Sequence, residues 1–321
     1  MATRDENPVF LCGAKAMERK IISGTYRDYL FLFGDSRTAY SDLSAKKSAV
    51  EKNLYIMLED GLPAGYICAN MSENLCNVSY AYTVAEKRRH GVFTALLKYL
   101  TQLDDIAAVS VQISESQENF ASIVKTCEAA GFHQDSVLKI FRADWESLHT
   151  WKETYFDNFM ATHGHKYLEY FARRNFKVYS FADAPEKYLE QLYHSHENFF
   201  ENTLDVKRFF DGYDKNLVAR DISFLSVKDD KLAAYYLATS PDGNNVVVEQ
   251  TAVAKKYLNS GAMLPLWDKF IRTLYIRQCN NMAFAIYSEN TPAIKFDAKI
   301  TKNLKLTETR LYKYAFTKIL R

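Results

Sequence analysis

The chain has few cysteines and no long run of apolar residues. Its 321 residues include five widely spaced cysteines, Cys12, Cys68, Cys76, Cys127 and Cys279. An odd number at such spacing argues against a disulfide framework or a zinc site, so we expect reduced thiols. No apolar stretch is long enough to cross a bilayer, and the polar start MATRDENPVF lacks a signal-peptide core. We therefore expect a cytoplasmic protein with no membrane partner.

Net charge is also nearly absent. Lys and Arg number 41 and Asp and Glu number 39, which gives a formal net charge of +2. Broad nucleic-acid binding needs a concentrated basic face, so we expect no nucleic-acid partner. His163 and His165 have no Cys or carboxylate beside them at ligand spacing, so we expect no metal site.

Two common phosphate-binding motifs are missing as well, although Val84 to Leu97 (VAEKRRHGVFTALL) has the layout of an anion site. The stretch contains neither G-x-x-x-x-G-K-[ST] nor G-x-G-x-x-G. It runs from a predicted strand through a basic turn at Gly91 into an apolar helix. The first N–H groups of a helix lack internal partners and lie at the positive end of its dipole, which favours phosphate or pyrophosphate. The predicted anion-binding residues are Arg88, Arg89, His90, Gly91, Val92, Phe93 and Thr94.

This turn resembles the acyl-coenzyme A (acyl-CoA) loop of the GNAT (Gcn5-related N-acetyltransferase) superfamily, Q/R-x-x-G-x-G/A. Arg88 and Gly91 occupy its first two fixed positions, and Phe93 stands at the third, where a small residue is usual. Phe93 fits there if its ring turns toward the sheet. The resemblance implies acetyl-CoA or another acyl-CoA as cofactor. It also implies that a backbone N–H near Val84 polarises the thioester carbonyl.

The flanking pattern is similar to the GNAT order of elements through about residue 145. We predict two strands within 54–70 joined at Asp60-Gly61, strands at 77–84, 108–114 and 136–142, and a helix at 119–130. The resemblance implies a mixed α/β sheet of the α+β type, splayed between its fourth and fifth strands to admit the pantetheine arm. Asn119 and Gly131-Phe132 fit the spacing of frequent companions of this site, so Asn119 joins the predicted cofactor-binding residues.

The second half of the chain repeats the first. Val227 to Thr239 resembles Leu58 to Asn70, and Gly261 and Asn290 keep nearly the spacing of Gly91 and Asn119. Since 321 residues also exceed one core of usual size, we predict two GNAT-like modules in tandem. Each is expected to be a mostly antiparallel sheet with a central splay, flanked by helices. The predicted domains are 1–148 and 149–321, with a packed helical segment over about 142–176.

The second copy lacks parts of the first. Leu258 stands in place of Arg88, and Lys299-Ile300 takes the place of Gly131-Phe132. We therefore expect one CoA per chain, bound by the first copy, and a degenerate second copy that completes the substrate pocket or serves the structure. If the second copy is active, its best base is Glu249, which lies four residues before Val253 as Tyr80 lies four before Val84.

Transfer to an amine needs proton movement, because a model alkylamine has a pKa of about 10.4 and is neutral in only about one molecule per thousand at pH 7. The resemblance implies direct attack on the thioester, often with a Tyr acid four residues before Gly-Phe, where this chain has Cys127. Tyr80 and Tyr82 share one strand face, and Glu115 follows a predicted strand, so these are further candidates for proton transfer. Cys127 is a candidate acid or nucleophile. Each candidate also has a purely structural alternative: aromatic packing for the two tyrosines, a solvated loop carboxylate for Glu115, and a buried core thiol for Cys127.

Three functions fit the sequence. The first is an N-acetyltransferase that acts on a primary amine of a small molecule, amino acid or peptide. The second is a non-catalytic acyl-CoA-binding or regulatory protein, which the Phe93 and Cys127 departures favour. The third is aminoacyl transfer of the FemABX type, which takes aminoacyl-tRNA and is expected to show more basic surface. The acceptor and the oligomeric state stay open, because specificity in this fold lies in variable loops.

Overall fold

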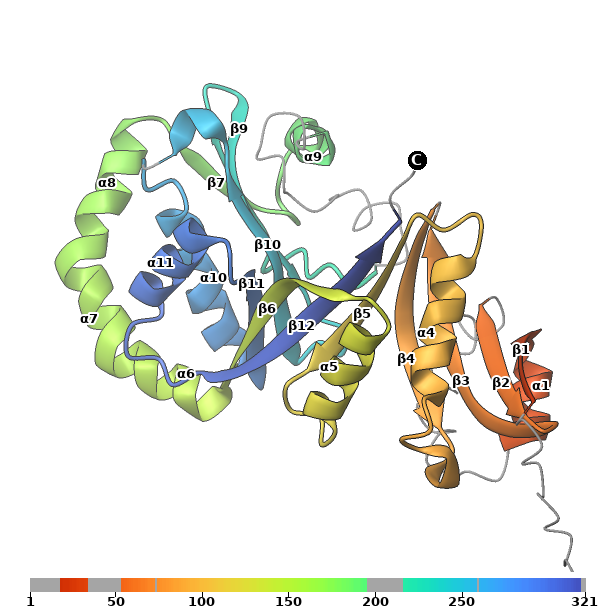
Figure 1. Ribbon diagram of the computed structural model, residues 1–321. Coiled ribbons are helices and arrows are strands. Elements are labelled where there is room, and N and C mark those ends of the chain that lie inside the picture. The colour runs from red at the N-terminus through yellow and green to blue at the C-terminus, as the bar shows by residue number, and fades with distance from the viewer. Residues whose placement is uncertain (1–17, 34–52, 73, 195–215, 259, 319–321) are drawn as a thin grey trace, which may run out of the picture. The chain divides into compact units, whose positions relative to one another are not determined.

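The computed structural model describes residues 18–33, 53–72, 74–194, 216–258 and 260–318 (Figure 1). Cys12 lies outside these ranges. The chain divides into two compact units, the first made of residues 1–136 with 312–321 and the second of residues 137–311. The boundary lies between residues 136 and 137, not at the expected residue 148, and the end of the chain belongs to the first unit.

The first unit is a sheet with helices on both faces. Its strand order is β1 (Arg19–Gly24), β2 (Leu54–Glu59), β3 (Leu62–Ser72), β4 (Leu75–Thr83), β5 (Ala108–Ser114) and the end of β12 (Thr307–Thr317). Pairing is antiparallel from β1 to β4 and parallel between β4 and β5. The helices named in this unit are α1 (Tyr26–Phe33), α4 (Val92–Gln102) and α5 (Phe120–Ala129).

Local sequence explains how this sheet is covered. Asp60 and Gly61 join β2 to β3 with positive φ angles of 50° and 79°, the two-residue turn that the sequence predicts. Along β3, Tyr66 packs with α1 in one apolar cluster, whereas Ile67 packs with α4 and α5 in another. Successive strand residues point to opposite faces, so β3 needs apolar side chains on both.

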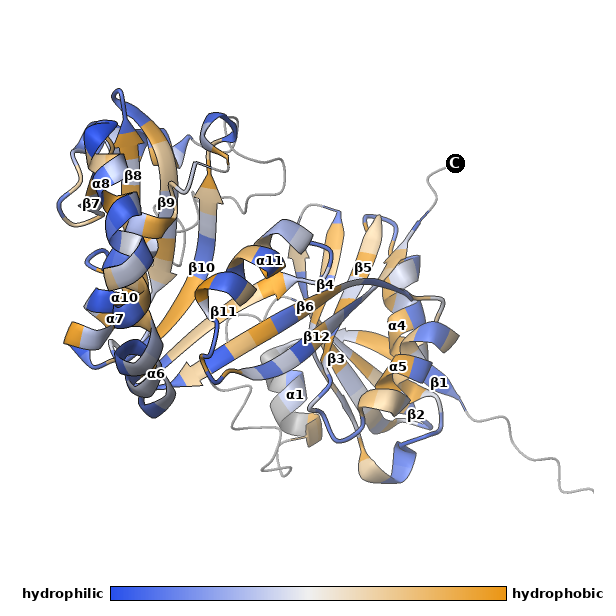
Figure 2. Ribbon diagram, turned by 90° about the vertical axis from the view of Figure 1, so that its left-hand side faces the viewer, coloured by the Kyte–Doolittle hydropathy of each residue, from blue (hydrophilic) through white to orange (hydrophobic). Residues whose placement is uncertain are grey.

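The second unit repeats this plan. Its strand order is β6 (His133–Asp144, from Val137 onward in this unit), β11 (Asn281–Tyr287), β10 (Asn245–Val253), β9 (Lys231–Thr239), β8 (Phe224–Lys228) and β7 (Lys177–Ser180). Only β10 and β11 are parallel among the pairs described here. Its helices include α9 (Glu186–Tyr193), α10 (Leu264–Arg277) and α11 (Thr291–Ile300). Strands β8 and β9 are almost wholly buried and largely hydrophobic (Figure 2).

Matching irregularities in the two sheets confirm the tandem repeat. The β3–β4 register shifts between Cys68 and Ala69, and the β9–β10 register shifts between Val248 and Gln250. The glycines after β4 and β10 have nearly equal φ angles, 78° at Gly91 and 77° at Gly261. Two copies of one α/β module therefore share backbone detail as well as order.

The segment between the repeats is helical, as predicted. It comprises α6 (Trp145–Trp151), α7 (Asp157–Phe159) and α8 (His165–Arg173), joined by the π-helical turns Lys152–Phe156 and Met160–Gly164. A carboxylate does accompany the histidines, contrary to expectation: Glu169, one helical turn after His165, pairs with it at 3.4 Å. Within the described ranges, no three His, Cys, Asp or Glu side chains gather as metal ligands would.

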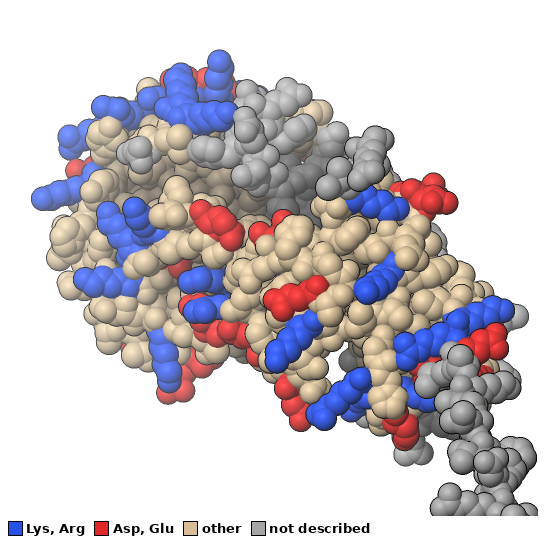
Figure 3. All heavy atoms as spheres, viewed as in Figure 1, with Lys and Arg blue, Asp and Glu red and all other residues tan. Residues whose placement is uncertain are grey.

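None of the described helices is both long and apolar enough to span a membrane. On the face in Figure 3, positive and negative side chains are interspersed, and Lys and Arg gather over the β8–β9 turn.

Candidate functional site

The turn after β4 forms an open anion-binding geometry. A short 3₁₀ turn, η1 (Ala85–Lys87), follows β4, and Arg89 and Gly91 then adopt positive φ angles of 68° and 78°. Helix α4 begins directly after Gly91, and its first internal bond runs from Ala95 N to Gly91 O at 2.9 Å. The N–H groups at Val92, Phe93 and Thr94 therefore have no acceptor within the helix and point out of its N-terminus.

The side chains of this turn suit an anion. Arg88, Arg89 and His90 are exposed, so their polar groups reach solvent at the mouth of the turn. Phe93 is half-buried and packs against the apolar cluster of α4 and α5, so its ring turns into the core. Gly91 is exposed, and its positive φ angle is one that residues with a side chain rarely adopt.

A buried carboxylate that sequence reasoning missed lies behind the turn. Glu59 is 1 % exposed and pairs with Arg19 at 2.9 Å and with Lys87 at 3.1 Å. The Arg19 guanidinium also donates to the His90 carbonyl at 2.6 Å. The signal available in the sequence was a charged residue ending the otherwise apolar strand LYIMLE.

Strands β4 and β5 separate beside this turn. Their parallel pairing covers only Leu75 to Val78 and Ala108 to Val111, although β4 continues to Thr83 and β5 to Ser114. The β3–β4 register shift lies where the separation begins, with Ser79 as the extra residue. The expected splay between the fourth and fifth strands is therefore present in the first unit.

Known proteins match this chain in structure but not in sequence. A scan against family models and a search of curated proteins each find no match. Among solved structures, a tandem GNAT protein from the clavulanic acid biosynthesis pathway matches with a TM-score of 0.56 and 13% identity, over 94% of this chain and 98% of that chain. The protein has a tandem GNAT fold.

Two further GNAT structures support the assignment of the fold. A GCN5-related N-acetyltransferase from Sphaerobacter thermophilus matches with a TM-score of 0.57 and 12% identity, over 93% of this chain and 95% of that chain. A glucosamine N-acetyltransferase region of a fungal multi-domain GH3 β-N-acetylglucosaminidase gives a TM-score of 0.64 and 10% identity, over 94% of this chain and 38% of that chain. The GNAT resemblance in the sequence is thus confirmed at the level of the fold.

One predicted backbone donor of the GNAT site is already used. The Val84 N–H donates to the Ala64 carbonyl at 3.0 Å, so the expected donor near Val84 has to be a neighbouring N–H and not that of Val84 itself. Hydrogen bonds alternate along an antiparallel pair, so the N–H groups of Ala81 and Thr83 point away from β3, toward the side of β5. The Thr83 carbonyl accepts from Arg88 Nε at 3.3 Å, in agreement with that direction.

The two candidate tyrosines share a face, as predicted. The rings of Tyr80 and Tyr82 lie 5.9 Å and 5.6 Å from the buried Tyr66 ring, on the α1 side of the sheet. Phe33 of α1 lies edge-on to Tyr82 at 6.3 Å. Both candidates are half-buried, so each ring packs in the cluster and is also partly accessible to solvent.

The remaining candidate residues differ in how far their side chains are buried. Glu115 lies exposed in the turn after β5, and Asn119 is exposed at the N-cap of α5, where its side chain makes no capping bond. Cys127 is fully buried among apolar side chains, and burial raises the pKa of its thiol to about 12. A thiol that is buried and protonated at neutral pH does not suit the proposed nucleophile or an accessible acid, so we withdraw Cys127 from the candidate site.

The corresponding turn of the second unit is built differently. Phe171 of α8 packs against Gly261, 3.5 Å from where a Cβ on that glycine would stand, although the glycine itself is exposed. Helix α10 begins only at Leu264, three residues after Gly261, and Leu258 replaces Arg88. The second GNAT-like turn therefore has no basic side chain between its 3₁₀ turn, η6 (Lys255–Tyr257), and its glycine, and no helix start directly after that glycine.

Structural register corrects two sequence equivalences. Tyr80 pairs with Cys68 and Gln250 pairs with Leu237, so Gln250, and not Glu249, is the counterpart of Tyr80. Glu249 is the extra residue of the bulge and accepts from Thr239 Oγ1 at 2.7 Å.

The second correction concerns Gly131-Phe132. Gly131 and Asn303 both have positive φ angles, 90° and 66°, in the turn after the helix, and Phe132 and Leu304 behind them are both buried. Asn303-Leu304, and not Lys299-Ile300, therefore occupies the place of Gly-Phe.

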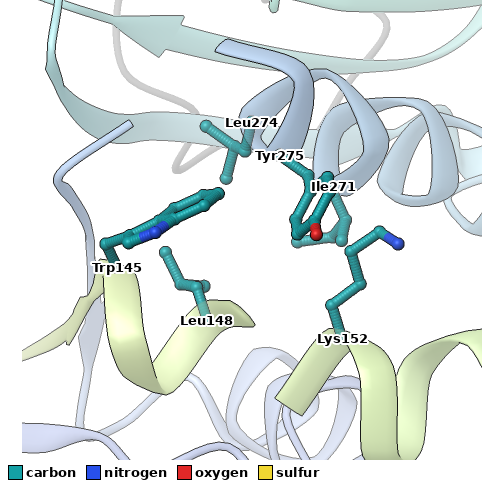
Figure 4. Close-up of a pocket in the computed structure, with 6 residues that line it drawn as sticks. All are labelled: Trp145, Leu148, Lys152, Ile271, Leu274 and Tyr275. Atoms are coloured by element: carbon teal, nitrogen blue, oxygen red, sulfur yellow. The ribbon is translucent and has the colours of Figure 1, made fainter. Parts of the chain in front are cut away.

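An apolar niche between α6 and α10 lies elsewhere in the second unit (Figure 4). Lys152 Nζ lies 4.3 Å from the Tyr275 ring centre and pairs with Asp157 at 2.8 Å. Trp145 packs beside Tyr275, and the remaining lining residues are Leu148, Ile271 and Leu274. Because the Lys152 ammonium group is already paired with Asp157, we interpret the niche as part of the packing between helices.

Proposed function

We propose that this protein is an N-acyltransferase whose first unit transfers an acetyl group from acetyl-CoA to a primary amine of a small molecule, amino acid or peptide. One observation carries the proposal: an exposed basic glycine turn at the start of α4 lies beside the separation of β4 from β5. The fold shared with the N-acetyltransferase from Sphaerobacter thermophilus supports it.

The donors of the first unit fit a pyrophosphate group. Backbone N–H groups at Val92, Phe93 and Thr94 supply directed hydrogen bonds, and Arg88 and Arg89 supply positive charge. We assign Asn119, whose side chain is not spent on capping, to the amides of the pantetheine arm. Acetyl-CoA would supply the activated acyl group as a thioester.

Proton movement and charge stabilisation are assigned to residues of β4 and to Glu115 after β5. The N–H groups of Ala81 and Thr83, directed toward the splay, are the proposed donors to the developing oxyanion. Tyr82 or Tyr80 is the proposed acid for the departing thiolate, and Glu115 the proposed base for the amine, directly or through water.

Non-catalytic acyl-CoA binding is the second candidate function. The buried Cys127 at the place of the usual acid favours it, because a fully buried thiol cannot reach a leaving group in this arrangement. Binding without turnover would then be the whole activity.

Release of free thiol from acetyl-CoA tests the proposal. The purified protein is assayed across a panel of amines, amino acids and peptides, with Arg88→Ala as the site variant and Arg142→Ala, on β6, as the matched control. We expect acceptor-dependent release that falls at least tenfold in Arg88→Ala alone. Tight CoA binding with no release for any acceptor would favour the binding protein, and absence of both would overturn the assignment of this turn.

A further inference from the structure

A triad of charged side chains lies behind the glycine turn of the first unit, and we call it the loop brace: Arg19, Glu59 and Lys87. Glu59 is the centre, with its side chain wholly buried and one oxygen paired to each cation, at 2.9 Å and 3.1 Å. A carboxylate taken out of water is costly unless it is paired, so these contacts hold all three groups together. Two of them are tied to the turn, since Lys87 lies within it and Arg19 bonds to it.

The brace acts on the peptide between His90 and Gly91. Arg19 donates to the His90 carbonyl at 2.6 Å, on the side of Glu59. In a planar trans peptide the C=O and the following N–H point in opposite directions. Drawing the His90 carbonyl toward Arg19 therefore turns the Gly91 N–H away from the brace, and positive φ angles on both sides of His90 accommodate that orientation.

The second unit shows that the fold itself does not require these ions. Register places Phe176, Lys228 and Tyr257 at the positions of Arg19, Glu59 and Lys87. There Lys228 Nζ lies 5.1 Å from the Phe176 ring and 5.9 Å from the Tyr257 ring, and the two rings meet edge-on at 5.7 Å. The same three positions thus form an aromatic and cation–π cluster in the second unit and an ionic brace in the first, where Arg88 and Arg89 follow.

We propose that the loop brace is a positioning device for anion binding, with Glu59 as its central positioning residue. It sets the Gly91 N–H and the start of α4 for the pyrophosphate and leaves Arg88 and Arg89 exposed to neutralise it. This inference rests on the proposed acyl-CoA function of the first unit.

The direction in which CoA affinity changes in one variant distinguishes positioning from a simple effect of charge. Glu59→Gln removes a negative charge close to an anion site, so charge alone would tighten binding of CoA. Loss of the brace would instead weaken the binding of CoA. We expect Glu59→Gln to raise the dissociation constant of CoA about tenfold, which corresponds to about 1.4 kcal/mol. The matched control is Glu86→Gln, which removes the same charge from an exposed residue of η1 and should not weaken binding.

A second pair of variants keeps the test decisive if Glu59→Gln does not fold. Arg19 Nη2 contacts both Glu59 and the His90 carbonyl, and Arg19→Lys keeps the charge but puts it on a shorter side chain with a compact ammonium group. We expect it to weaken CoA binding severalfold, whereas Lys20→Met, on the next residue of β1, should not.

Calorimetry measures the dissociation constants of both pairs of variants for CoA and for pantetheine, which lacks the pyrophosphate. The variants should lose affinity for CoA and keep that for pantetheine within about twofold, because the brace acts on the phosphate end. In turnover assays the KM for acetyl-CoA should rise with kcat little changed. Normal binding by the wild type with unchanged or tighter CoA binding in Glu59→Gln and Arg19→Lys would overturn the brace alone. Failure of the wild type to bind CoA would overturn the proposed function and the brace with it.

Discussion

At the scale of single residues, burial and pairing decide which chemistry a side chain can perform. Cys127 and Glu59 show opposite outcomes. Both are buried, but the thiol has no cation beside it among the described contacts and burial raises its pKa to about 12, whereas the carboxylate has a cation on each oxygen. The first is therefore a core residue, and the second orders the turn in front of it.

The tyrosines of β4 give a prediction at this scale. We expect Tyr82→Phe or Tyr80→Phe to lower kcat at least tenfold, since general acid catalysis contributes about 10²–10⁴-fold. The ring and its packing on Tyr66 would remain, so CoA affinity and stability should change little. Steady-state kinetics with acetyl-CoA measure the effect, with Tyr99→Phe on α4 as the control. Unchanged kcat in both β4 variants would leave these residues a packing role only.

At the scale of elements, the start of α4 depends on close contact with the sheet. A Cβ added to Gly65 of β3 would lie 2.6 Å from the Tyr82 carbonyl oxygen and 2.8 Å from Val92 Cγ1. Glycine at this position thus lets the first turn of α4 rest on β3 and β4, where the anion-binding N–H groups must be held.

Gly65→Ala should therefore disturb both stability and the site. We expect a loss of about 1–3 kcal/mol in the free energy of unfolding, because one of the crowding atoms belongs to the backbone and cannot rotate away. Urea titration measures this loss, and calorimetry should show weaker CoA binding. Gly243→Ala is the control for the binding readout: its added methyl meets no atom within 4 Å, its φ of +78° should lower stability through backbone strain, and CoA binding should stay unchanged. A Gly65→Ala variant as stable as the wild type would contradict this account of how α4 is seated.

At the scale of the whole molecule, the two units have the same plan but unequal turns. The first turn has Arg88, Arg89 and His90 exposed directly before its glycine, whereas the second has no basic side chain there and Phe171 packs against its glycine. The end of β12 completes the first sheet beside β5, as β6 completes the second beside β11. A duplicated sequence has thus kept the sheet and changed the turn.

Binding stoichiometry is the prediction at this scale. We expect calorimetry to give one CoA per chain, because the second turn lacks the Arg88 equivalent and its helix begins three residues after Gly261. Arg88→Ala should weaken that single site, whereas Lys256→Ala in the second unit should leave it unchanged. Two equivalent sites per chain would contradict this account and show that the second turn binds CoA without those features.

The order of elements, the repeat and the basic glycine turn follow from local sequence alone. These features depend on local rules: positive φ at Gly91, apolar periodicity in the helix after it, and the turn at Asp60-Gly61. Spacing counted along the chain placed Glu249 opposite Tyr80, but the longer β9–β10 turn shifts the count by one residue. A bulge and its register are set by pairing between strands, which a single strand does not encode.

Which groups of the site are available depends on tertiary contacts. The Val84 N–H is spent on Ala64, and Cys127 is enclosed by the core. Glu59 and Arg19 lie behind a turn that begins 26 and 66 positions later in the numbering, at Ala85. Availability and charge pairing depend on contacts between residues distant in sequence, and those contacts exist only once the sheet has formed.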